Sequence, residues 1–154
     1  MDAPGAPTPR ERPVRQPVLL GLFAGAGIAA GYLLAGVPGV ELMTLVAVLA
    51  GIALGPARGA LAGGIAEAVY SVGSPYGIAA PPLLAAQVAG VALAGALGAL
   101  VAPVLLRAGR TPRAAAVAGV LGALTALAFD ILTNLGIVAG YGLDWRAVAV
   151  GALG

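Results

Sequence analysis

The sequence predicts an all-α, polytopic transmembrane helical bundle with five full spans and the start of a sixth. Composition is the first reason, because 60% of the 154 residues are hydrophobic and 9% are charged, a balance that ordinary soluble domains do not show. The second reason is that long apolar runs are separated by short turns of the Gly and Pro type that end helices. The chain has no cysteine or histidine, which excludes disulfides, thiolate nucleophiles and histidine metal sites.

Residues 1–16 are polar, contain several prolines and hold three arginines, so we expect a flexible basic tail in the cytoplasm. The apolar run that follows is long enough for a retained signal-anchor. A bilayer requires about 20 apolar residues per helix, so the third predicted span is short and the fifth is long. The run from residue 145 is too short to cross, and we expect a sixth helix that is truncated or ends early. The predicted spans are 17–36, 39–55, 58–73, 82–106 and 112–140, with a partial span from 145.

The arginines alternate between successive connections. Three lie in the tail, Arg58 follows the second span, and Arg107, Arg110 and Arg113 surround the connection between the fourth and fifth spans. The other connections hold only Arg146. By the positive-inside rule the N-terminus is cytoplasmic, and the connections after the first, third and fifth spans face outside.

Strongly polar side chains gather in the outer half of the predicted bundle. Asp130 and Asn134 are four residues apart and share one face of the fifth span. An ionisable group at the centre of a membrane segment costs roughly 2.5–3.5 kcal/mol even on lenient scales, and it marks a functional site by default. A pore would need polar groups at every depth, so their confinement to one depth favours a binding pocket that opens outward. The candidate substrate-binding residues are Glu67, Tyr70, Tyr76, Gln87, Asp130 and Asn134.

Small residues recur at four-residue spacing on the first and fourth predicted spans. This spacing lets two helix backbones approach closely in lipid. On the fourth span, the stripe of Gly90, Ala94, Gly98 and Ala102 is predicted to pack against this protein's own helices. On the first span a partner subunit explains the pattern equally well, and the candidate partner-facing residues are Ala26, Ala30, Gly27 and Gly31.

Four stretches carry a family resemblance: VPGVELMTL at 37–45, GPARGAL at 55–61, YSVGSPYG at 70–77 and PPLLAAQ at 81–87. In these stretches the chain resembles the S components of energy-coupling factor (ECF) transporters, which are small, usually six-helix membrane proteins that capture a vitamin or related micronutrient. The resemblance covers roughly residues 17–154, and the missing body of a sixth helix departs from the family's pattern.

The resemblance implies a substrate pocket near the extracellular side, a first helix that docks on a transmembrane coupling subunit, and two cytoplasmic ATPase subunits that supply the energy. Ala26 and Ala30 match the docking motif. Asp130, Asn134, Gln87 and Tyr76 fall where pocket residues are expected.

We therefore expect a non-enzymatic, cofactor-free substrate-binding subunit of an ECF-type importer, multi-pass in a bacterial cytoplasmic membrane. The ligand is expected to be neutral to cationic and rich in N–H donors, because Glu41, Glu67 and Asp130 have no arginine at their depth. One alternative is a structural or assembly subunit without a ligand, in which the polar groups only satisfy one another. The other is an intramembrane enzyme that uses the Glu67 and Asp130 carboxylates, although no nucleophile, metal motif or phosphate loop accompanies them.

Overall fold

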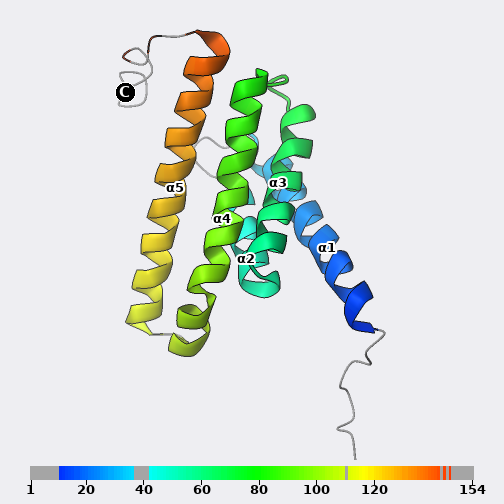
Figure 1. Ribbon diagram of the computed structural model, residues 1–154, viewed down its shortest axis with the longest axis vertical. Helices are drawn as coiled ribbons and strands as arrows, with labels where there is room; N and C mark the ends of the chain where they lie inside the picture. Colours follow the sequence, from blue (N-terminus) through cyan, green and yellow to red (C-terminus); the bar gives the residue numbers. More distant parts are fainter. Residues whose placement is uncertain (1–10, 37–41, 110, 143, 145, 147–154) are drawn as a thin grey trace, which may run out of the picture.

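The computed structural model describes residues 11–36, 42–109, 111–142, 144 and 146. Within these residues the regular structure is entirely α-helical (Figure 1), which confirms the predicted all-α class. The helices are α1 (Glu11–Leu34), α2 (Met43–Leu54), α3 (Pro56–Val72), α4 (Pro81–Ala108) and α5 (Pro112–Tyr141).

Three of these helices contain segments long and apolar enough to cross a membrane: Arg15–Leu34 in α1, and all of α4 and α5. Helices α2 and α3 have 12 and 17 residues, fewer than the roughly 20 that a perpendicular span requires. The structure thus supports a membrane protein with three helices of spanning length, and it does not show the five full spans that the sequence predicts. Helix α1 begins at Glu11, inside the predicted tail. Residues 1–10 and most of the predicted partial sixth span lie outside the described residues.

Local sequence explains where the helices turn. Gly55 adopts a φ of 90°, which favours glycine, and Pro56 then opens α3, so a single residue separates α2 from α3. At the start of α5, the Thr111 hydroxyl accepts a hydrogen bond of 3.3 Å from the Ala114 backbone N–H, and this is a side-chain N-cap. Gly142, in the left-handed conformation, caps the other end of α5.

Helices α2, α3 and α4 form the centre of the bundle, with α1 packed against α2 and α3 on one side and α5 packed against α4 on the other (Figure 1). Glycines make the central contacts possible, since a Cβ atom on Gly59 would lie 2.7 Å from the Gly95 carbonyl oxygen. Gly90 lies against Phe129 of α5, and Gly98 lies against the backbone of Val48 in α2. The small-residue stripe on α4 therefore packs inside this protein, as predicted.

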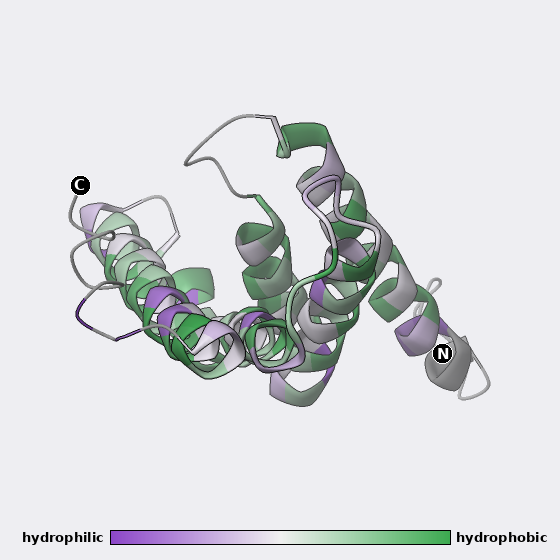
Figure 2. Ribbon diagram, turned by 90° about the horizontal axis from the view of Figure 1, so that it is seen from above, coloured by the Kyte–Doolittle hydropathy of each residue, from purple (hydrophilic) through white to green (hydrophobic). Residues whose placement is uncertain are grey.

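Most of the helical ribbon is apolar by residue hydropathy (Figure 2). Many large apolar side chains are exposed, and Leu22, Leu33, Leu100, Leu124 and Leu135 are each more than half exposed. Such a surface suits contact with lipid. The α2–α3 and α4–α5 turns lie at the same end of the bundle as the start of α1, and the α3–α4 connection lies at the opposite end (Figure 1). The arginines that surround the two turns are thus separated from the α3–α4 connection by the length of the bundle.

Candidate functional site

Two neighbouring cavities lie toward the end of the bundle that carries the α3–α4 connection. The central cavity, of about 210 Å³, is lined by residues from all five helices. The loop cavity, of about 330 Å³, lies beneath the α3–α4 connection and reaches the end of α5. Tyr70 and Gln87 line both, so these two side chains form the boundary between the cavities.

Glu67 is the one acidic residue among the described residues that line the central cavity. Its side chain is only 4% exposed and accepts a hydrogen bond of 2.7 Å from the Ser71 hydroxyl, one turn further along α3. Ser71 is equally buried. Because a carboxylate in a low-dielectric site is stabilised by each donor it accepts from, the Ser71 hydroxyl helps to hold Glu67 at this position.

Tyr70 forms one wall of the central cavity, and its ring packs across α1 where that helix has no side chain. A Cβ atom on Gly31 would lie 2.9 Å from the Tyr70 ring. The Tyr70 ring also meets the Tyr32 ring edge to face, with 5.2 Å between the ring centres, an arrangement that aromatic pairs prefer. Gly31 is therefore needed for the position of the tyrosine.

Gln87 brings an unused hydrogen-bond acceptor to the site. Its side-chain carbonyl oxygen is fully buried, yet it has no partner within the described part of the chain. The hydroxyl of Thr133, on α5, is in the same condition. A buried polar group without a partner costs about 1–3 kcal/mol, so such groups are rare in folded proteins and call for an explanation.

The electrostatics of the two cavities favour hydrogen-bond donors. None of the described residues that line either cavity is basic. The central cavity is instead lined by the acidic side chain of Glu67 and the amide side chain of Gln87, next to the aromatic rings of Tyr70 and Phe129. A molecule that fits there would present N–H or O–H groups to the acceptors and a flat or apolar surface to the rings.

Two tyrosine hydroxyls tie the α3–α4 connection to its neighbours above the loop cavity. The Tyr76 hydroxyl donates to the carbonyl oxygen of Ala35, just beyond the end of α1. The Tyr141 hydroxyl, at the end of α5, accepts from the Ala80 backbone N–H at 3.5 Å. These bonds join segments from three parts of the chain over the cavity.

The structure brings together four of the six predicted substrate-binding residues. Glu67, Tyr70 and Gln87 line the central cavity, and Tyr76 lines the loop cavity with Tyr70 and Gln87. Asp130 and Asn134 line neither of these cavities.

Asp130 lies away from the α4-facing side of α5. Helix α5 faces α4 through Phe129, Gly136 and Gly140. Asp130 is exposed and lines a separate groove between α2 and α5.

Several cavity residues were not predicted from the sequence, including Phe129 and Met43 in the central cavity and Tyr141 in the loop cavity. Apolar side chains in an apolar sequence give no signal of their own. Ser71 was recognisable, because its position four residues after Glu67 places both on one helical face.

The four predicted partner-facing residues of α1 lie in different surroundings in the structure. A Cβ atom on Gly27 would lie 2.9 Å from the Ala66 Cβ atom, and one on Gly31 would meet Met43 and Tyr70. These two glycines pack within the chain, against α2 and α3. Ala30 lines the central cavity, whereas Ala26 is exposed.

The described residues include no group of three or more Asp or Glu side chains that could hold a metal ion. Comparisons of the chain with protein-family models, curated proteins and solved structures find no match. Function is therefore argued from the geometry and charge of the two cavities.

Proposed function

We propose that this protein is the substrate-binding S component of an ECF-type importer and captures a small micronutrient from the outside of a bacterial cytoplasmic membrane. In this proposal α2 and α3 are also embedded in the membrane, the N-terminus is cytoplasmic, and the end of the bundle with the α3–α4 connection faces outward. The observation that carries the proposal is the pair of buried acceptors, Glu67 and Gln87, in a cavity at that end.

The unused acceptor on Gln87 favours ligand capture over a purely structural role. A subunit that only packs a larger complex would bear the cost of this buried group, about 1–3 kcal/mol, in its final state. A binding protein bears it only while empty, because a ligand donor then satisfies the carbonyl oxygen. The position of Gln87 on both cavities also suits a ligand that enters through the loop cavity.

The same features define the class of ligand. Because no basic residue is among the described lining of either cavity, the site favours a neutral or cationic molecule with several N–H donors, such as an amine or a nitrogen heterocycle, over a polyanion. The central cavity, at about 210 Å³, is smaller than the roughly 300–1,000 Å³ typical of sites for drug-sized ligands. The part of the ligand that reaches Glu67 is therefore compact.

The test is a binding titration of the purified protein with a panel of vitamins and their precursors, guided by mass spectrometry of co-purifying small molecules. We expect Glu67→Gln to weaken binding of the best ligand by about 10- to 100-fold, since a hydrogen bond to a charged group contributes roughly 1.5–3 kcal/mol. Asp130→Asn is the matched control, because it removes a carboxylate that lines neither cavity, and it should leave affinity unchanged.

Two outcomes contradict this proposal. Tight binding of a polyanionic ligand that Glu67→Gln does not reduce would refute the electrostatic argument. If no small molecule binds and Glu67→Gln has no effect beyond stability, the protein is a structural or assembly subunit.

The proposed partners are a transmembrane coupling subunit and two cytoplasmic ATPase subunits. The exposed Ala26 on α1 is the residue of the predicted docking motif that remains accessible on the outer side of the bundle. A small residue there allows close approach of a partner helix.

A further inference from the structure

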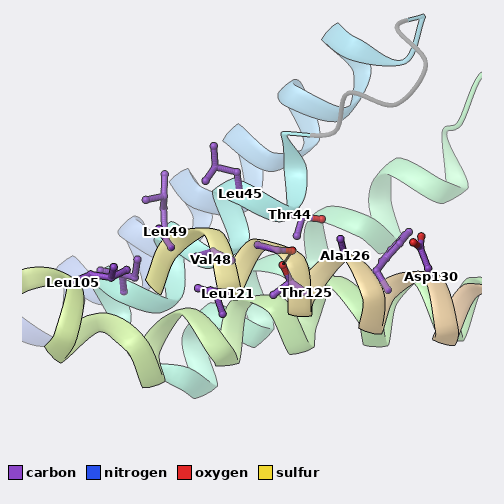
Figure 3. A pocket seen from close by; sticks show the side chains of 13 residues that line it. Thr44, Leu45, Val48, Leu49, Leu105, Leu121, Thr125, Ala126 and Asp130 are labelled. Atoms are coloured by element: carbon purple, nitrogen blue, oxygen red, sulfur yellow. Dashed lines mark hydrogen bonds between the residues drawn. The ribbon is translucent and has the colours of Figure 1, made fainter. Parts of the chain in front are cut away.

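A groove separate from the ligand cavities runs between α2 and α5 (Figure 3). It has a volume of about 490 Å³, and α2 contributes one wall, α5 the other, with Leu105 of α4 at one end. The groove is mainly apolar, with Leu45, Val48 and Leu49 on the α2 side. It shares Phe129 with the central cavity but none of the acceptors discussed above.

The α5 wall of the groove includes a row of small residues that ends on a carboxylate, beside the larger Leu121, Thr125 and Phe129. Ala118, Gly122, Ala126 and Asp130 all line the groove, and their four-residue spacing keeps them on one face of the helix. A Cβ atom on Gly122 would meet no atom within 4 Å, so this wall is open. From Ala118 to Asp130 the row extends about 18 Å at a rise of about 1.5 Å per residue, a length that matches more than three turns of another helix.

Asp130 makes no hydrogen bond or ion pair that involves the described part of the chain. It lies within four residues of the midpoint of α5 (Pro112–Tyr141), or about 6 Å along the helix axis. Because α5 has the length and hydropathy of a membrane span, a membrane-spanning α5 would hold the carboxylate near the middle of the bilayer. A charged group at that depth normally pairs with another group.

We propose that this groove holds a transmembrane helix of a second protein, and that this helix carries an arginine or lysine near its midpoint that pairs with Asp130. The apolar walls and the small residues on α5 would pack against the helix, and the basic side chain would neutralise the carboxylate. This proposal does not rest on the proposed transport function.

The depth and charge of Asp130 decide between this occupant and others. A lipid headgroup lies at the membrane surface, too far from the middle of α5 to reach the carboxylate. A second copy of this chain lacks a suitable cation on its described helices, because Arg15, Arg58, Arg107 and Arg113 all lie near helix ends. The complement to Asp130 is therefore expected on a helix of different sequence.

The experiment measures binding of defined helices to the full chain in lipid nanodiscs. Two synthetic 21-residue Leu/Ala transmembrane peptides, identical except for Arg or Leu at the central position, carry an acceptor dye, and the protein carries a donor dye. We expect the Arg peptide to bind at least tenfold more tightly than the Leu peptide, and Asp130→Asn to remove this preference.

A glycine pair on α5 supplies the matched steric control. Gly122→Leu places a side chain in the groove and should weaken binding of the Arg peptide at least tenfold. Gly119→Leu introduces the same side chain one turn away, also in open space but outside the residues that line the groove, and should have no effect. Circular dichroism and size-exclusion chromatography check that each variant is folded, and the conservative Asp130→Asn variant remains informative if Gly122→Leu does not fold.

Equal affinity for the Arg and Leu peptides, or an Arg preference that survives Asp130→Asn, would overturn the proposal. Energy transfer between two differently labelled copies of the protein would also overturn the proposal if both Asp130→Asn and Gly122→Leu abolish it. That result would identify a second copy of this chain as the occupant of the groove.

Discussion

Gly63 and Gly64 are neighbours in the middle of α3, but a methyl group would meet different surroundings at each. A Cβ atom on Gly63 would lie 2.8 Å from the Val91 carbonyl oxygen and 2.9 Å from the Ala47 Cβ atom. A Cβ atom on Gly64 would meet its nearest neighbour, the Ala92 Cβ atom, at 3.6 Å, which is ordinary contact. Gly63→Ala therefore forces α3 away from both α2 and α4, whereas Gly64→Ala does not.

The size of the effect follows from two opposing contributions. Alanine favours a helix over glycine by up to about 1 kcal/mol, and this gain is the same at both positions. Contacts of 2.8 and 2.9 Å fall 0.5–0.6 Å short of the 3.4 Å at which ordinary contact begins, and such overpacking costs about 1–3 kcal/mol. We expect Gly63→Ala to be less stable than Gly64→Ala by about 1–3 kcal/mol, with Gly64→Ala at or slightly above the wild type.

The assay is unfolding by SDS in mixed micelles, followed by near-ultraviolet circular dichroism of the aromatic side chains, with heating in detergent as a second measure. Glu67 lies one turn after Gly63 on α3, so ligand affinity should fall in Gly63→Ala and stay constant in Gly64→Ala. Equal unfolding midpoints for the two variants would show that the close packing of α3 against α2 and α4 is not as described.

Three further predictions concern the cavities and the surface of α1. Gln87→Leu should stabilise the ligand-free protein, because it removes a buried acceptor that has no partner in the described part of the chain. The same change should weaken ligand binding at least tenfold, and unchanged affinity in a titration would contradict the proposed role of Gln87 in ligand binding. Ala26→Trp should prevent co-purification with the proposed coupling subunit and leave ligand affinity intact, whereas Ala30→Trp should fill the central cavity and abolish ligand binding. The opposite pattern would reverse the two assignments. Tyr76→Phe removes the hydroxyl that donates to the Ala35 carbonyl oxygen, so the free energy of unfolding should fall by about 0.5–1.5 kcal/mol and the ligand should dissociate faster. Identical stopped-flow dissociation rates for the variant and the wild type would exclude a role for this contact in retaining the ligand.

The candidate site could be predicted in part, and the residues show why. Glu67, Tyr70 and Gln87 are polar groups in apolar helices, where each needs a partner, so the sequence marks them clearly. Asp130 and Asn134 are marked in the same way, but they lie on faces of α5 that do not meet α4 at the cavities. Polarity and helical period indicate that a residue has a partner and which residues share its face. They do not indicate which neighbouring helix that face meets.

The sequence by itself determined the helical class, the turns and the alternation of arginines, because hydropathy, Gly and Pro conformation and charge act over short stretches of chain. Tertiary structure alone decided that α2 and α3 are packed at the centre while α5 contacts mainly α4. It also decided that Gly27 and Gly31 serve internal packing while Ala26 stays exposed. The physical reason is that small residues allow close approach on any face of a helix. Which face receives a neighbour depends on how all the helices fit together.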